Sequence, residues 1–181
     1  MADKLPSKNI LNLLFVHDTD SGDLYWRERT PELSPRMTPA MLDHWNSKYS
    51  GRKATCVANN GFLVVNLDRK VTLVHRIVYK MHTGIEPRKV DHIDRNPLNN
   101  RIDNLRAADD HINAWNSGKK HHNTSGYKGV VYFAQTNKWS AKVGYKRKLI
   151  HGGYYNTKEE AHAAACDLRR KLHGEFACDG Q

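Results

Sequence analysis

A polar segment near residue 120 divides this chain into two parts that must bury their apolar residues separately. Residues 117–126 read Ser-Gly-Lys-Lys-His-His-Asn-Thr-Ser-Gly and offer no apolar side chain to a core. Such a composition is typical of a linker. A length of 181 residues accommodates one large domain or two small ones. We therefore predict a first region at 1–117, a linker at 118–126 and a second domain at 127–177.

The positive charge of the chain is concentrated after this division. The whole chain has 29 Lys+Arg and 19 Asp+Glu, a formal net charge of +10. Residues 117–181 hold 12 basic and 5 acidic residues, and the stretch 117–150 holds eight basic residues and no acidic one. Such an excess favours a polyanionic partner, most simply nucleic acid. We expect the second part of the chain to hold it.

Two classes of protein are disfavoured by the residue pattern. No apolar stretch approaches the roughly 20 residues that cross a bilayer, and the apolar run from Ile10 to Val16 is broken by Asn12. We therefore expect a cytoplasmic protein without a membrane partner. The three cysteines, Cys56, Cys166 and Cys178, are far apart and form no C-x-x-C pair. Neither a disulfide framework nor a cysteine-rich zinc site is expected.

The first part of the chain alternates short strand and helix signals. Apolar spacing predicts a helix over 8–16, and Leu24-Tyr-Trp26 predicts a strand after a turn at 20–23. Residues 30–53 contain three prolines and predict a loop with a helix near 39–46. The runs 61–67 and 71–74 predict a β-hairpin. A helix ending at Gly84 follows from apolar residues at i, i+3, i+4 and i+7, namely Val74, Ile77, Val78 and Met81.

The C-terminal part predicts three strands and one helix. Residues 138–146 alternate between apolar and mostly lysine positions, which places the two sets on opposite faces of a strand. Residues 127–134 and 148–155 predict flanking strands. Thr157-Lys-Glu-Glu160 predicts a capping box at the start of a helix that ends at Gly174. The buried stripe of that helix is expected at Ala161, Ala164, Ala165, Leu168 and Leu172. A cationic sheet face would then remain outside.

The segment from Val90 to Asn116 carries the residues most suited to chemistry. Asp91-His92 follows a short β-like piece, a loop rich in asparagine and aspartate comes next, and Asn104-Leu-Arg106 predicts a second short strand. Asp109 or Asp110 would then cap a helix bearing Asn113. Two strands and a helix can bring Asp91, His92 and Asn113 together. A histidine can take a proton from water, and carboxylate and amide oxygens suit Mg²⁺.

Residues 74–116 resemble the HNH (ββα-metal) endonuclease motif in its phage and homing variant. The matching elements are Val74-His-Arg76, Asp91-His92, Asn99-Asn-Arg101, Asn104-Leu-Arg106 and Asn113 to Asn116. The resemblance implies an α+β fold, with a ββα-metal core preceded by β-hairpins. It further implies that His92 is the general base and that Asp91 and Asn113 hold one Mg²⁺ or Mn²⁺ ion. Asn104 would hold the loop and help to orient the histidine.

Several residues of this motif and near it can have structural rather than catalytic roles. Asn99 and Asn100 would serve as turn formers in a loop of this composition. His75 is expected to pack against its helix or to support the site rather than to bind a metal. Asn116 is a rival to Asn113, because a three-residue step stays on one helix face.

Residues 127–177 resemble the APETALA/ethylene-response-factor DNA-binding domain of plants. The matching residues are Tyr127-Lys-Gly-Val130, Lys138-Trp139, Ala141, Gly153-Tyr-Tyr155, Thr157 and Glu159 to Ala164. The resemblance implies a three-stranded antiparallel sheet packed on one helix, with the sheet in the major groove. DNA-facing positions would be Lys128, Lys138, Lys142 and His151. Val131, Phe133 and Gly144 stand where the family has arginines, so its target sequence is not transferable.

The turn residues Lys146, Arg147 and Lys148 are predicted to bind phosphate, with a merely solvated turn as the alternative. We predict a homing-type, metal-dependent endonuclease that nicks or makes a staggered break in double-stranded DNA. A monomer without a small-molecule cofactor is expected, in the cytoplasm of a bacterial host. Two alternatives stay open: a DNA-binding regulator with a vestigial nuclease fold, and a nicking factor that supports phage DNA packaging.

Overall fold

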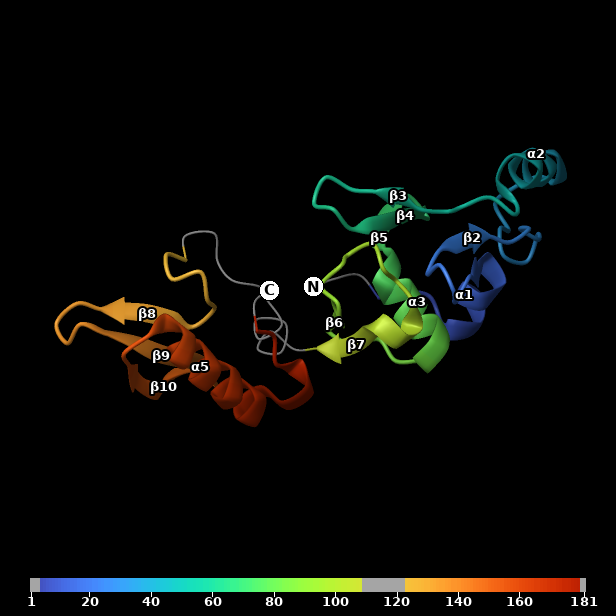
Figure 1. Ribbon diagram of the computed structural model, residues 1–181. Coiled ribbons are helices and arrows are strands. Elements are labelled where there is room, and N and C mark those ends of the chain that lie inside the picture. The colour runs from blue at the N-terminus through green and yellow to red at the C-terminus, as the bar shows by residue number, and fades with distance from the viewer. Residues whose placement is uncertain (1–3, 109–122, 180–181) are drawn as a thin grey trace. The chain divides into compact units, whose positions relative to one another are not determined.

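The computed structural model describes residues 4–108 and 123–179, which form parts of two compact units. The first unit spans Met1–Ala107 and the second Ala108–Gln181 (Figure 1). The predicted boundary at residue 117 lies outside the described residues. Residues 118–122 of the predicted linker lie outside the described residues. Residues 123–126 form a hydrogen-bonded turn of the second unit, in which the buried Ser125 hydroxyl donates to the Val130 carbonyl.

The first unit combines short helices with small antiparallel sheets. Strands β1 (Phe15–His17) and β2 (Leu24–Trp26) form a hairpin, and β3 (Cys56–Val57), β4 (Leu63–Leu67) and β5 (Lys70–Leu73) form a three-stranded sheet. Strands β6 (Lys89–His92) and β7 (Leu105–Ala108) pair with each other. The helices are α1 (Lys8–Leu14), α2 (Pro39–Tyr49) and α3 (Val74–Thr83), with a 3₁₀ turn at Ile102–Asn104. This is a mixed α/β unit.

Most sequence-predicted elements of this unit are confirmed, with shifted ends. The first helix stops at Leu14 instead of residue 16, because Phe15 and Val16 pair with β2. The hairpin β4–β5 turns at Asp68 and Arg69, which both have positive φ. Helix α3 ends at Gly84 as predicted, with the glycine in the left-handed conformation.

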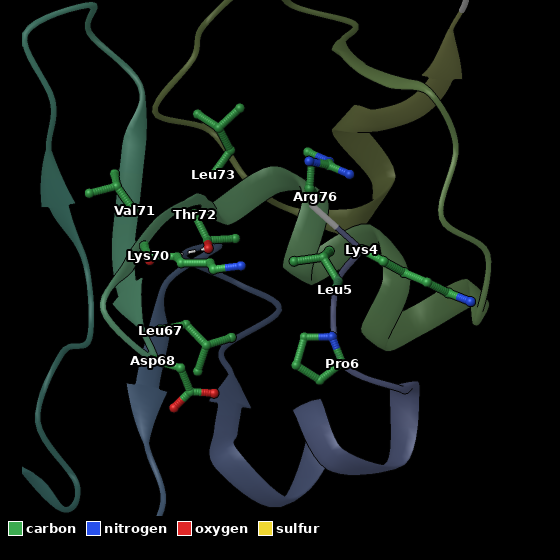
Figure 2. A pocket seen from close by; sticks show the side chains of 10 residues that line it. All are labelled: Lys4, Leu5, Pro6, Leu67, Asp68, Lys70, Val71, Thr72, Leu73 and Arg76. Carbon is green, nitrogen blue, oxygen red and sulfur yellow. Dashed lines mark hydrogen bonds between the residues drawn. The ribbon is translucent and has the colours of Figure 1, made fainter. Parts of the chain in front are cut away.

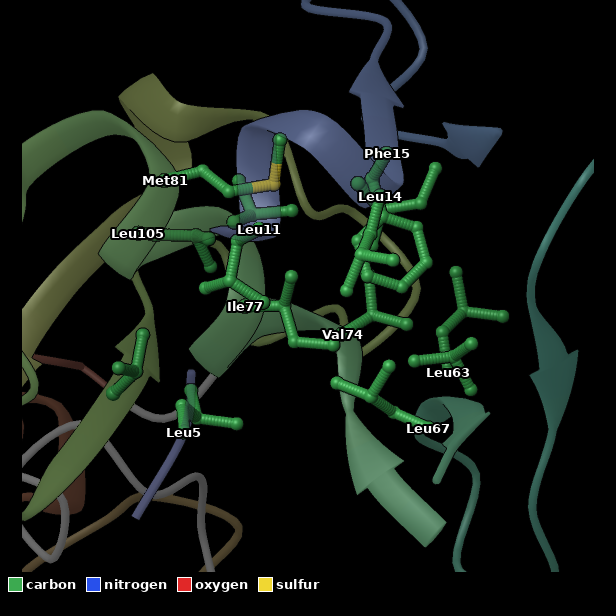
Figure 3. Close-up of a cluster of buried hydrophobic side chains, with 14 residues drawn as sticks. Leu5, Leu11, Leu14, Phe15, Leu63, Leu67, Val74, Ile77, Met81 and Leu105 are labelled. Carbon is green, nitrogen blue, oxygen red and sulfur yellow. The ribbon is translucent and has the colours of Figure 1, made fainter. Parts of the chain in front are cut away.

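One hydrophobic cluster joins the helices to the sheets of the first unit. Figure 3 shows side chains from α1, α3, β4 and β7 converging, and Leu11, Phe15, Leu24, Ile77 and Val78 are almost completely buried. The apolar stripe of α3 thus faces inward, as its spacing predicts. Because β6 and β7 pack against this helix through Val90 and Leu105, the cluster fixes where the Asp91-His92 pair lies.

Glu86 fastens the N-terminal segment to α3. Its carboxylate accepts hydrogen bonds from the Leu5 amide, from Arg76 Nη2 at 2.9 Å and from Lys80 Nζ at 2.7 Å. The Lys80 ammonium is buried and also donates to the Leu5 carbonyl at 2.9 Å. Burial alone would raise the pKa of Glu86, but these hydrogen bonds and positive charges hold it below the usual value.

We predict that Glu86→Gln lowers the free energy of unfolding at pH 7 by about 2 kcal/mol, the scale of charge-assisted hydrogen bonds. Since the folded-state pKa is lowered, the carboxylate stabilises the protein above its unfolded-state pKa of about 4.3. That contribution is lost as pH falls through the folded-state value. Urea denaturation of both proteins from pH 7 to pH 3 should show the difference shrink. Equal stability at pH 7 would contradict the prediction, and Glu28→Gln, at an exposed carboxylate, is the control.

Helix α2 is attached to the first unit through aromatic rings. Trp26 and Trp45 meet edge to face at 5.4 Å, and the Arg29 guanidinium lies 4.2 Å from the Trp45 ring centre. Asn46 bonds both the amide and the carbonyl of Arg29. This explains how a segment with three prolines, the last of them at the start of α2, still holds a helix in place.

The second unit is a three-stranded sheet covered by one helix, as predicted. Strands β8 (Val130–Phe133), β9 (Lys138–Tyr145) and β10 (Lys148–Tyr155) lie in the order β10-β9-β8, all antiparallel. Helix α5 (Lys158–His173) begins with the predicted capping box and is followed by a 3₁₀ turn at Gly174–Phe176. The core between sheet and helix contains Val130, Ala141, Ala161 and Ala165.

Two local features of the second unit differ from the prediction. Strand β8 begins at Val130 rather than 127, because Gly129 has φ +76° and its carbonyl accepts from the Lys142 amide. A Cβ at Gly129 would lie 2.5 Å from the Lys142 carbonyl oxygen, so only glycine fits. Arg169 of α5 is 1% exposed, although the predicted buried stripe of this helix does not include it. Its guanidinium bonds Asp179 and the Lys128 carbonyl, which joins the C-terminal segment to the turn before β8.

Among the helices described, none is long and apolar enough to cross a membrane.

Candidate functional site

Asp91 and His92 are buried at the end of β6, and Asn104 closes the loop that follows them. Asn104 Oδ1 accepts from the Asp94 amide at 3.0 Å, and its Nδ2 donates to Asp94 Oδ1 at 2.9 Å and to the Asn99 carbonyl at 2.8 Å. Burial alone would raise the pKa of Asp94, but hydrogen bonds from Asn96, Asn99 and Asn104 lower it. The side chain of Asn104 thus holds the loop between β6 and β7 in shape.

The His92 ring is in hydrogen-bond contact with Asn100. His92 Nε2 lies 3.1 Å from Asn100 Oδ1, and Asn100 Nδ2 donates to the Leu98 carbonyl at 3.3 Å. An amide oxygen only accepts, so a neutral His92 ring carries its proton on Nε2 and has its lone pair on Nδ1. Asn100 is completely buried. The sequence suggested only a turn-forming role for Asn100, since nothing in the motif distinguishes it from the neighbouring Asn99.

His75 packs directly beside His92. The two rings are perpendicular with centres 5.0 Å apart, and Phe62 contacts both. Burial, followed by the nearness of His92 and Arg76, lowers the pKa of His75 to about 3. Its Nδ1 is buried and has no hydrogen-bond partner among the described residues. His75 is therefore a neutral neighbour of His92, which agrees with the packed role expected from the sequence.

The Asp91 carboxylate is paired with Arg106 of the adjacent strand β7. Arg106 donates to Asp91 Oδ2 from Nε at 3.0 Å and from Nη2 at 2.9 Å, and both side chains are largely buried. Both bonds end on the same oxygen, so Arg106 anchors Oδ2 and compensates the charge of the carboxylate. A buried carboxylate next to a histidine is a hard oxygen donor of the kind that Mg²⁺ or Mn²⁺ takes.

Asn113, the remaining predicted metal ligand, lies outside the described residues, and so does its rival Asn116. The helix that would complete a ββα core falls in the same segment. Within residues 4–108 and 123–179, no three His, Cys, Asp or Glu side chains gather as a metal site would require. The carboxylate-and-amide pair implied by the HNH resemblance does not need such a cluster.

Three of the predicted DNA-facing residues share one face of the second unit's sheet. Cross-strand pairing sets Lys138 opposite Phe133 and Lys142 opposite His151. Because directly paired residues point to the same side of a sheet, these side chains lie on the face away from α5. We call this the outer face of the sheet; it also carries Val131, Ser140 and Tyr154. The His151 ring contacts Ser140 Oγ at 2.9 Å and packs on Tyr154.

The basic turn 146–148 extends from the end of this sheet. Lys146 and Arg147 form the tip of the β9–β10 hairpin, both with positive φ, and the side chains of Lys146, Arg147 and Lys148 are exposed. Lys128 lies elsewhere. Its ammonium donates to the Cys178 carbonyl at 3.1 Å, so it is held at the C-terminal segment rather than on the outer face.

A surface hollow of about 540 Å³ lies between the N-terminal segment and β5 (Figure 2). Lys4, Lys70 and Arg76 give it a partly basic lining, but Asp91 and His92 do not contribute to it. The hollow is therefore distinct from the residues that carry the candidate chemistry.

Comparison with known proteins agrees with the motif. A family described as HNH endonuclease matches residues 72–114, which contain His75, Asp91, His92, Asn100 and Asn104. The chain is also similar to Protein 3.8 of Escherichia phage T7, with 40% identity over 88 residues, or 49% of this chain and 72% of that protein. No solved structure matches the chain significantly.

Proposed function

Because this chain belongs to the same family as the phage T7 Protein 3.8 and contains an HNH endonuclease domain at residues 72–114, we propose that it is a metal-dependent DNA endonuclease with His92 as its general base. The observation that carries this proposal is the setting of the His92 ring. The ring is buried beside Asp91, and its Nε2 donates a hydrogen bond to Asn100 Oδ1. That arrangement leaves the lone pair of the neutral ring on Nδ1.

The proposed reaction is hydrolysis of a phosphodiester bond. His92 Nδ1 takes a proton from a water molecule as the water oxygen attacks phosphorus and the bond to the leaving oxygen breaks. His75 supports this role because a neutral neighbour leaves His92 free of repulsion between two charged rings. Asp91 and Asn113 would hold one Mg²⁺ or Mn²⁺ ion, which supplies positive charge to the phosphate and the leaving oxygen. Arg106 orients the Asp91 carboxylate.

The second unit is proposed to hold the DNA, in the manner of the APETALA-type domain that it resembles. The outer face of its sheet presents Lys138, Lys142 and His151, and the basic turn 146–148 adds three exposed cations. A two- or three-stranded sheet fits the major groove, and lysine and arginine at the turn suit the phosphate backbone. Lys128 is left out of this surface because of its bond to Cys178.

We further propose a homing-type activity, in which the protein cuts DNA at a long, degenerate site. It is supported by one HNH copy on a chain with a separate basic unit, and by a phage relative. A single copy acting as a monomer in the infected cell would cut one strand at a time.

A time course on supercoiled plasmids carrying phage and bacterial DNA fragments tests this version. With Mg²⁺ we expect open circles to accumulate before any linear product, and a chelator should prevent both. Linear product that appears at once, with no open-circle intermediate, would contradict cutting of one strand at a time.

A further inference from the structure

The β1–β2 turn packs tightly against the backbone that carries Asn100. A Cβ at Gly22 would lie 2.8 Å from the Asn100 carbonyl carbon and 2.7 Å from the Arg101 nitrogen. Arg101 also binds the turn, because its Nη1 donates to the Asp20 carbonyl at 3.2 Å. Only a glycine lets the turn approach this closely. A hairpin about 80 residues earlier in the chain therefore buttresses the loop next to His92.

His17, at the end of β1, connects this turn to Asn100 by a hydrogen bond. Its Nε2 lies 3.2 Å from the Asn100 carbonyl oxygen, and its Nδ1 lies 2.8 Å from His82 Nε2 at the end of α3. A carbonyl oxygen only accepts, so His17 donates from Nε2 and accepts at Nδ1 from His82. Burial and then the nearby His82 lower the pKa of His17, while burial and then Lys8 lower that of His82. The arrangement requires a neutral His17 ring, and the lowered pKa of His17 agrees with it.

We propose that His17 is a positioning residue for His92 and acts through Asn100; this rests on the proposed nuclease function. Two hydrogen bonds join the rings in sequence: His17 Nε2 holds the Asn100 carbonyl, and Asn100 Oδ1 holds His92 Nε2. Asn100 is completely buried, so its carbonyl oxygen depends on this donor from the protein. Loss of the His17 donor lets the Asn100 backbone shift and frees the His92 ring to rotate or to change tautomer.

Two substitutions separate this role from general packing. His17→Gln keeps an amide donor near the place of Nε2, whereas His17→Asn keeps a polar group only near Nδ1. We expect His17→Asn to lower the single-turnover cleavage rate about 10- to 100-fold, the range for groups that orient a catalytic side chain. His17→Gln should restore most of the rate. DNA affinity should be unchanged in both, and His44→Ala, at an exposed histidine of α2, is the control.

The His92 ring provides a readout that does not depend on activity. Nitrogen NMR of the imidazole in the full chain should show the Nε2–H tautomer in the wild type and in His17→Gln, and a mixture in His17→Asn. Wild-type cleavage and an unchanged tautomer in His17→Asn would overturn the proposal, as would equal loss of rate in both variants. If the wild type binds DNA without cutting it, the proposed nuclease function is wrong. The His92 tautomers in the wild type and in the variants would still show whether His17 positions Asn100 against His92.

Discussion

Replacing His92 with alanine is expected to lower the single-turnover cleavage rate by about 10²- to 10⁴-fold, the contribution typical of a general base. DNA binding should persist, because the cations proposed to hold DNA lie in the second unit. The measurement is a quenched cleavage time course at saturating protein, with a binding titration of the same variant. His92→Gln keeps an amide that can contact Asn100 and should be equally inactive.

These variants separate the nuclease from a regulator with a vestigial nuclease fold. Cleavage by His92→Ala at the wild-type rate would show that another group takes the proton. Loss of binding together with cleavage would point to a structural role for the ring. His44→Ala is a matched histidine substitution at an exposed position of the same unit, and it should cleave normally.

Neutralising the basic turn is expected to have the second large effect. The triple variant Lys146→Gln, Arg147→Gln, Lys148→Gln would remove three phosphate contacts. Each contact contributes a slope of about −0.9 to the dependence of log K on log salt concentration. At about 0.15 M salt, three contacts correspond to a loss of affinity on the order of 100-fold, with a salt slope shallower by about 2.7. The cleavage rate of fully bound DNA should not change.

The control for this variant removes the same charge from the other side of the same unit. The control replaces three exposed residues of α5, the helix that covers the opposite face of the sheet. The substitutions are Lys158→Gln, Arg170→Gln and Lys171→Gln. That triple variant should keep most of the affinity. If both variants lose affinity equally, the net charge of the unit matters rather than the position of the turn. An unchanged affinity in the turn variant would favour the solvated-turn alternative.

Elements with a strong local period could be predicted from the sequence alone. The apolar spacing from Val74 to Met81 predicts α3, and the capping box at Thr157 and Glu160 predicts the start of α5. Alternation along residues 138–146 predicts the two faces of β9. The Asp91-His92 pair is predicted as the reactive pair because its residue types suit phosphate chemistry and because its surroundings resemble a known motif.

Residues whose role depends on distant contacts could not be predicted in this way. His17 lies 83 residues before Asn100, and Arg169 reaches Lys128 across 41 residues. No local pattern indicates either contact, because tertiary packing alone brings the partners together. For the same reason, the sequence predicts only loop formation for Asn100. Its hydrogen bond to His92 depends on the path of the loop, which Asn104, Asp94 and Gly22 determine together.

The uneven charge of the sequence corresponds to a division of the proposed tasks. In the region with the candidate chemistry, two carboxylates are paired with nearby cations: Asp91 with Arg106, and Glu86 with Lys80. The second unit instead exposes lysines and an arginine at its hairpin turn. DNA would therefore be attracted mainly by the second unit, while the reaction depends on a few buried side chains of the first.

The most direct test of this account is to start the reaction with the metal ion. The full chain is mixed with supercoiled DNA in a chelator until binding is complete, and excess Mg²⁺ is then added. We predict that bound plasmid stays intact before the addition and is converted to open circles afterwards, at a rate that saturates with Mg²⁺ concentration. Plasmid that stays supercoiled in a complex shown to be bound, or that is cut equally well in the chelator, would contradict the central claim.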